Sequence, residues 1–117
     1  MKLHEIIEIL KAEVLTGDRE SQMEILSACG SDLMSDVMAY VKDNVLLLTG
    51  LINPQVIRTA EVMDIKVVAF VRGKIPDSNI LELAREKDIT VIRTEYPMFI
   101  ACGKLYKAGI TGRGADC

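Results

Sequence analysis

Three basic side chains follow or end two of the strand-like apolar runs in this sequence. Arg72 and Lys74 come after the run VVAFV, and Arg93 belongs to the end of the run TVIRT. If these runs are parallel strands, their carboxyl ends meet at one edge of a sheet, where ligands of open α/β sheets bind. Cationic side chains beside unpaired backbone amides bind phosphate and other anions. The sequence therefore predicts a site for a small anionic ligand at this edge.

Small and polar residues at the same predicted edge complete the candidate site. Ser31 and Asn53 suit N-cap positions, where helix amides are exposed, and Pro54 suits the first helical position. Gly50 and Gly73 would let a ligand approach the backbone. The alternative is that these loops carry solvated charges and bind nothing. The candidate ligand-binding residues are Gly30, Ser31, Thr49, Gly50, Asn53, Arg72, Gly73, Lys74 and Thr94.

Other residues with catalytic potential lack the partners that catalysis requires. Cys29 precedes a predicted helix start, which can lower a thiol pKa, but a small residue at a tight turn is the simpler interpretation. Asp32 and Asp36 are expected one turn apart on a helix, either as a carboxylate pair or as two solvated acids. His4 is the single histidine, and the phosphate-loop, dinucleotide, hydrolase-elbow and C-x-x-C motifs are absent. We therefore predict no catalytic residue, no metal site and no cofactor.

Alternating strand-like and helix-like patterns position these residues. Strands are predicted at residues 13–16, 23–28, 45–49, 66–71 and 89–93. Helices are predicted around residues 3–10, from Ser31 to about Lys42, after Asn53, after Asp77 or Ser78, and from Pro97 to Gly109. Short connections and right-handed crossovers predict an α/β fold with a mostly parallel sheet of about five strands and helices on both faces.

Length and composition limit the function further. The chain has 117 residues, which suit one domain, placed here at residues 1–110 with a flexible tail at 111–117. A net charge of -3 argues against nucleic-acid binding, and no apolar run is long enough to span a membrane. The three cysteines are widely spaced and indicate no disulfide framework, so a cytoplasmic location is expected.

Four stretches of the chain resemble the DRTGG-domain family: SDLMSDVMAYV, TGLINPQVIRTAEV, VVAFVRGKIPD and VIRTEYPMFIACGKLYKAGI. The resemblance covers nearly the whole chain and points to a small stand-alone branch from anaerobic bacteria, often encoded near hydrogenase and regulatory genes. It implies a three-layer α/β/α sandwich, as in the N-terminal domain of HPr kinase/phosphorylase, and it assigns no catalytic residue. The family's Asp-Arg position holds residues 50–53 here, and its Thr-Gly-Gly position holds residues 71–73, so that Gly73 is retained.

Two functional hypotheses follow from these observations. The first is a non-catalytic regulatory domain that binds a small anionic ligand, such as a nucleotide or phosphometabolite, at the carboxyl edge of the sheet. The second is a ligand-free, homodimeric interaction domain that contacts a partner protein linked to hydrogenase or signalling complexes. Its candidate interface includes Met34, Met38, Met63 and Met98, although methionines at helical spacing usually lie in the core.

Overall fold

The computed structural model describes residues 1–40 and 44–110 of the chain. The elements follow the order α1 (Leu3–Leu10), β1 (Glu13–Thr16), β2 (Ser27–Gly30), α2 (Met34–Tyr40), β3 (Val45–Thr49), α3 (Pro54–Val62), β4 (Val67–Phe70), α4 (Ser78–Glu86), β5 (Thr90–Arg93) and α5 (Met98–Ala108). Strand and helix alternate along most of this order, as the apolar patterns predict. The predicted flexible tail and the predicted end of α2 fall on residues 111–117 and 41–43, which lie outside the described residues.

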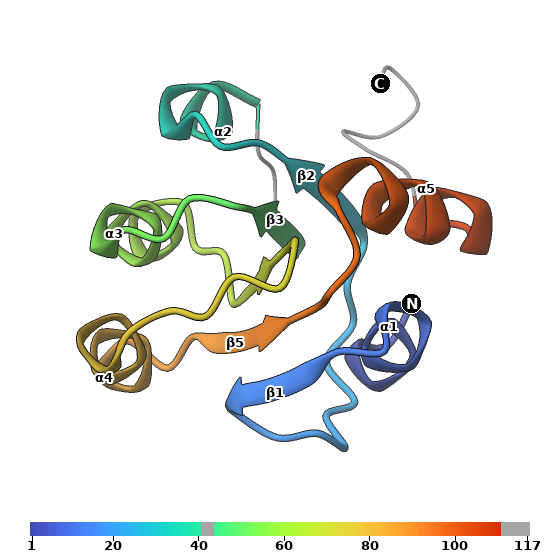
Figure 1. Ribbon diagram of the computed structural model, residues 1–117, viewed down its shortest axis with the longest axis horizontal. Coiled ribbons are helices and arrows are strands. Elements are labelled where there is room, and N and C mark those ends of the chain that lie inside the picture. The colour runs from blue at the N-terminus through green and yellow to red at the C-terminus, as the bar shows by residue number, and fades with distance from the viewer. Residues whose placement is uncertain (41–43, 111–117) are drawn as a thin grey trace.

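The strands form one sheet in the order β1-β5-β4-β3-β2 (Figure 1). β2, β3, β4 and β5 run parallel to one another, whereas β1 runs antiparallel to β5 at one edge. The mostly parallel, five-stranded sheet that the sequence predicts is therefore confirmed. Because the four parallel strands point the same way, the loops that follow them leave the sheet on the same side.

Helices cover both faces of the sheet and complete a three-layer α/β/α sandwich (Figure 1). Side chains of the central strands alternate between the two faces: Leu46 and Leu48 pack with α1 and α5, while Leu47 packs with α2, α3 and α4. The predicted three layers are confirmed, but the helices that connect the parallel strands form only one of the two helical layers. The connecting helices α2, α3 and α4 all lie on the same face, and the second face is covered by α1 and α5.

Local capping chemistry explains where several helices begin and end. The Asn53 side chain accepts a hydrogen bond from the amide of Gln55 (2.8 Å) at the start of α3. Asp77 accepts in the same way from the amide of Ile80 (3.0 Å) at the start of α4. Gly109 ends α5 with φ of 116°, a conformation that glycine adopts without a steric cost. These caps lie at the positions that the sequence predicts.

Two predicted elements have different boundaries in the structure. The strand predicted at 23–28 begins only at Ser27, because the preceding segment pairs with the start of the chain. There the amide of Leu3 donates to the carbonyl of Met23 (2.9 Å). The helix predicted from Ser31 begins at Met34, so Asp32 lies in the connection before α2. The expected pairing of Asp32 with Asp36 on one helix face is therefore wrong.

None of the described helices is long and apolar enough to cross a membrane.

Candidate functional site

Backbone hydrogen bonds tie the ends of the four parallel strands to one another. The amide of Ser31 donates to the carbonyl of Leu48 (3.0 Å), which joins the end of β2 to β3. The amide of Val71 donates to Thr49 (3.0 Å), and that of Thr94 donates to Phe70 (2.9 Å). The four chain reversals that the sequence predicts at a common edge therefore lie side by side.

A tight turn at residues 71–74 presents the basic side chain at the centre of this edge. Arg72 and Gly73 both adopt left-handed backbone conformations, with φ of 61° and 67°. A hydrogen bond between the first and last residues closes the turn (3.3 Å), and the amides of Arg72 and Gly73 donate to the carbonyls of Tyr96 and Thr94 (2.8 Å each). A left-handed conformation costs a residue with a β-carbon about 1–2 kcal/mol. These three hydrogen bonds offset that cost and hold Arg72 in position.

The carboxylate of Asp32 lies among three potential anion-binding groups. Its Oδ1 accepts hydrogen bonds from the backbone amide of Gly50 (2.6 Å) and from the hydroxyl of Thr49 (3.2 Å). Its Oδ2 lies 3.7 Å from Nη2 of Arg72. The donors come from β3, from the β3–α3 connection and from the turn after β4, while the acceptor comes from the β2–α2 connection. The arrangement brings together an amide, a hydroxyl and a guanidinium around one anionic group.

The absence of a side chain at Gly50 makes this geometry possible. A β-carbon there would overlap the guanidinium of Arg72, which lies directly over the glycine. The Arg72 and Asp32 side chains are 51% and 52% exposed, so solvent screens their attraction and the ion pair contributes less than about 1 kcal/mol. The charge-assisted bond from the Gly50 amide is the stronger contact, at roughly 1.5–3 kcal/mol.

Other predicted site residues lie at the same edge but have additional partners. The Asn53 side chain caps α3. The prediction that Ser31 caps α2 is wrong, because α2 begins at Met34 and the Ser31 hydroxyl accepts from the amide of Leu33 (3.0 Å) in a local turn before that helix. Lys74 is exposed and forms no ion pair with any residue in the described ranges. The structure thus brings Thr49, Gly50 and Arg72 into contact and places Lys74 two residues away from Arg72.

Gly30 and Thr94 face α5 and α1 instead of the Asp32 contact. A β-carbon on Gly30 would lie 2.8 Å from Sγ of Cys102 and 3.1 Å from Sδ of Met98, so this glycine allows α5 to approach β2. Thr94 is only 1% exposed, and its hydroxyl donates to the carbonyl of Leu10 at the end of α1 (2.7 Å). Both residues have packing roles that account for their size and polarity.

Arg93 is held by two carboxylates. It donates to Glu13 (2.9 Å) and to Glu95 (2.8 Å), and its side chain is only 17% exposed. The hydrogen bond to Glu13 is the main cause that raises the pKa of the Arg93 guanidinium, with a further contribution from Glu95. Its Nε is buried without a hydrogen-bond partner among the described residues. A further hydrogen bond from Arg93 to the carbonyl of Gly73 (3.3 Å) places this side chain between β1 and the turn at residues 71–74.

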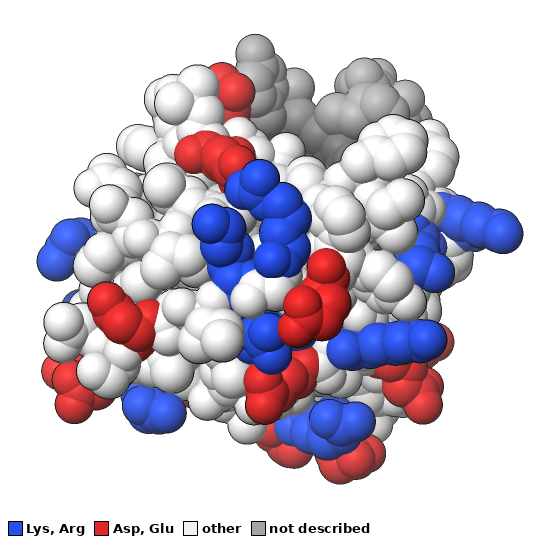
Figure 2. All heavy atoms as spheres, viewed as in Figure 1, with Lys and Arg blue, Asp and Glu red and all other residues white. Residues whose placement is uncertain are grey.

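Figure 2 shows that positive and negative side chains are interleaved on the face in view. Lys and Arg side chains group near its centre, and Asp and Glu side chains border that group. This distribution agrees with a net charge of -3, in which local cations are matched by neighbouring acids. A ligand at this face would therefore meet individual cations and backbone donors instead of a broad positive field.

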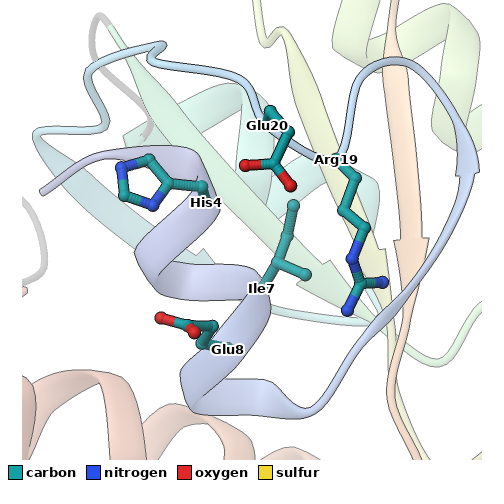
Figure 3. Close-up of a pocket in the computed structure, with 5 residues that line it drawn as sticks. All are labelled: His4, Ile7, Glu8, Arg19 and Glu20. Atoms are coloured by element: carbon teal, nitrogen blue, oxygen red, sulfur yellow. The ribbon is translucent and has the colours of Figure 1, made fainter.

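A separate hollow of about 300 Å³ lies beside α1 and is lined by His4, Ile7, Glu8, Arg19 and Glu20 (Figure 3). The first three residues come from α1, and the last two come from the connection between β1 and β2. The hydrogen bonds of the chain start with Met23 and Ser21 bring that connection against α1. In the described parts of the chain, no group of three or more His, Cys, Asp or Glu is arranged to hold a metal ion.

Sequence reasoning missed the role of Asp32 and the grouping around His4. Asp32 follows a predicted strand and precedes a predicted helix, so the sequence alone places it at the carboxyl edge of the sheet. Its expected place inside the first helical turn obscured this signal. The hollow beside α1 has no comparable sequence signal, because it depends on the pairing of residues 23–25 with the chain start, and no local pattern encodes that pairing.

The side chain of Cys102 carries a further thiol whose reactivity depends on its burial. It lies on α5, partly buried against Gly30, and burial raises the pKa of this thiol. A raised pKa lowers the thiolate fraction near neutral pH, and the thiolate is the reactive form. Cys102 is thus suited to packing instead of nucleophilic chemistry.

Comparison with known proteins identifies both a sequence family and a structural relative. The sequence profile of the DRTGG domain matches residues 5–107. A similar solved structure contains the CBS and DRTGG domains of the regulatory region of Clostridium perfringens pyrophosphatase, complexed with the activator diadenosine tetraphosphate. The two chains share 16% sequence identity with a TM-score of 0.72, over 97% of this chain and 51% of that one. This chain therefore spans about half the length of that structure. Among curated proteins, no sequence matches the chain.

Proposed function

Because the chain belongs to the DRTGG-domain family, we propose that it is a regulatory, ligand-sensing domain with no catalytic activity of its own. The ligand is a small anion, such as a nucleotide or a phosphometabolite, and it binds at the carboxyl edge of the sheet. Thr49, Gly50 and Arg72 provide the central contacts. Lys74 and the adjoining residues Ser31, Asn53 and Gly73 complete the rim of this site.

One observation carries the proposal: an amide, a hydroxyl and a guanidinium already surround an anionic group, the carboxylate of Asp32. These are the donor types that bind phosphoryl oxygens in other proteins. The solved relative adds support, since it is a regulatory region in complex with a tetraphosphate activator. A ligand of that chemical class presents several negatively charged oxygens to such donors.

Ligand-induced stabilisation tests the proposal directly. Inorganic phosphate, AMP, ATP and diadenosine tetraphosphate would be added separately at constant ionic strength while thermal unfolding is followed. A ligand at about tenfold its Kd stabilises the folded state by about 1.4 kcal/mol, which corresponds to roughly 5 °C in Tm for a chain of this size. We expect at least one of these anions to produce such a shift.

Two arginine variants locate the site. Arg72→Ala removes the guanidinium beside Asp32, and we expect about a tenfold weaker affinity, since a charge-assisted hydrogen bond contributes roughly 1.5–3 kcal/mol. Arg58→Ala makes the same charge change at an exposed position on α3 and serves as the control. Equal loss in both variants would mean that net charge, and not this site, controls binding. No shift with any anion would refute the proposal.

The exposed face of α5 favours a second function, in which two copies of the chain form a homodimer through this helix. Phe99 is 84% exposed and Tyr106 is 65% exposed, and they lie on one side of α5 with Gly103 between them. A β-carbon on Gly103 would have no neighbour within 4 Å, so a second helix can approach closely. Of the methionines proposed for an interface, Met38 is exposed, whereas Met34 is buried.

Molar mass in solution tests the second function. We expect light scattering to give the mass of two chains for the natural sequence. A variant with Phe99→Ser and Tyr106→Ser is expected to give the mass of one folded chain, because both side chains are exposed in the single chain and contribute nothing to its core. A natural chain that stays monomeric at all concentrations tested would exclude this dimer.

A further inference from the structure

The carboxylate of Asp32 satisfies the same donors that the proposed anionic ligand would need. The Gly50 amide lies 2.6 Å from Oδ1, and the Thr49 hydroxyl lies 3.2 Å from that same oxygen. The Arg72 guanidinium lies 3.7 Å from Oδ2. A phosphoryl oxygen that met these donors at similar distances would have to occupy the position of the carboxylate.

We propose that Asp32 is a built-in competitor, which occupies the anion site when no ligand is bound and leaves it when a phosphoryl group binds. This inference rests on the proposed function, since it describes how the same site is regulated. The exchange leaves no donor without a partner: two hydrogen bonds and one ion pair pass from carboxylate oxygens to phosphoryl oxygens, and the freed carboxylate becomes hydrated.

The position of Asp32 in the chain allows it to move. It lies in the connection between β2 and α2, outside both elements, and its carboxylate is half-exposed. In contrast, its partners are fixed: Gly50 directly follows β3, and Arg72 lies in a turn that is closed by three hydrogen bonds. The ligand would therefore displace the connection that carries Asp32 and leave the donors in place.

The displacement provides a way to report that the site is occupied. α2 begins at Met34, two residues after Asp32, and Met34 is buried in the core of that face. A change in the connection before α2 would alter how the exposed side chains of Leu33, in that connection, and of Met38, on the helix, are presented. Ligand binding at the sheet edge would then change the surface that a partner protein contacts at α2.

Substitution of the competing carboxylate tests this mechanism. Asp32→Asn keeps an oxygen that can accept from the Gly50 amide but removes the negative charge. In the natural chain the ligand must first break the charge-assisted hydrogen bond and the ion pair of the Asp32 carboxylate, which a neutral amide cannot form, and this competition reduces affinity by roughly fivefold or more. We therefore expect this variant to bind inorganic phosphate and ATP at least about fivefold more tightly than the natural chain. Asp36→Asn changes the net charge equally, on the exposed side of α2, and is expected to leave affinity unchanged.

A measurement on the natural chain does not depend on how the variant folds. The side-chain carboxyl ¹³C resonance of Asp32 is followed by NMR while phosphate is added at constant ionic strength. We expect this resonance to move toward the value of a hydrated aspartate along the same binding curve as the Gly50 amide. The resonance of Asp36 is expected to stay in place.

The possible results separate this mechanism from the proposed function. If the natural chain binds phosphate, but Asp32→Asn binds it no more tightly and the Asp32 resonance does not move, the competitor mechanism is overturned and the binding function stands. Tighter binding by Asp36→Asn to the same degree would also overturn the mechanism, because it would show a general charge effect. If neither the natural chain nor Asp32→Asn binds inorganic phosphate, AMP, ATP or diadenosine tetraphosphate, both proposals fail.

Discussion

The substitution Thr94→Val separates a structural role from a ligand-binding role at one predicted site residue. The Thr94 hydroxyl donates to the carbonyl of Leu10 (2.7 Å) and accepts from the amide of Tyr96 (3.2 Å). Leu10 is the last residue of α1 and is fully buried, so its carbonyl has neither a next helical turn nor water as a partner. The hydroxyl therefore anchors the end of α1 to the sheet.

The expected cost follows from the groups that lose their partners. A buried carbonyl without a hydrogen bond costs about 1–3 kcal/mol, and the part-buried Tyr96 amide adds a smaller amount. Valine has nearly the shape of threonine, so no cavity opens and a small apolar gain offsets part of the loss. We expect about 2 kcal/mol of destabilisation, or a Tm lower by roughly 8 °C, since unfolding entropy is about 2.1 cal/mol/K per residue.

Two further threonine variants act as controls for this prediction. Thr94→Ser keeps the hydroxyl and is expected to cost less than about 1 kcal/mol. Thr59 is also buried, but its side chain makes no hydrogen bond within the described residues, so Thr59→Val is expected to be neutral or slightly stabilising. Thermal unfolding by circular dichroism measures all three variants. A Tm for Thr94→Val within about 2 °C of the natural chain would refute the anchoring role, and loss of phosphate binding with normal stability would place Thr94 in the ligand site.

Four other predictions test local features of the fold. Thr16→Val should cost about 2–3 kcal/mol in urea unfolding, because its buried hydroxyl donates to Ile89 (2.8 Å) and accepts from Val91 (2.9 Å). Gly73→Ala should lower the unfolding free energy by about 1–2 kcal/mol through its φ of 67°, measured in the same assay. Asn53→Ala should cost about 1 kcal/mol through loss of the α3 cap, measured by thermal unfolding. Cys102, whose thiol pKa is raised by burial, should react more slowly with iodoacetamide in the folded chain than in urea at mildly alkaline pH, as followed by peptide mass spectrometry.

Local sequence patterns were sufficient to predict most of the fold. The run VLLLT at 45–49 is buried on both faces, as expected for a central parallel strand, and it forms β3 with the predicted bounds. Asn53 with Pro54 marks the start of α3 by cap chemistry alone. Signals of this kind depend only on neighbouring residues, and they need no knowledge of the remaining chain.

Features that depend on distant partners could not be predicted in this way. β2 starts four residues later than the apolar pattern suggests, because the carbonyl of Met23 is hydrogen-bonded to the amide of Leu3 at the start of α1. Thr94 has the polarity and position of a ligand-binding residue, but the carbonyl of Leu10 uses its hydroxyl. The residues next to Met23 and Thr94 in the sequence do not indicate either of these hydrogen-bond partners.

The same limit explains why the sequence predicts Asp32 in a helix and not in contact with Gly50 and Arg72. An acid after a serine, just before an apolar helical pattern, fits the first turn of a helix, where the dipole favours it. The structure offers Asp32 a stronger partner, since the Gly50 amide has no acceptor in the sheet and lies beside a cation. These donors come from segments that are distant from Asp32 in the sequence, so the residues next to Asp32 do not indicate that it leaves the first helical turn.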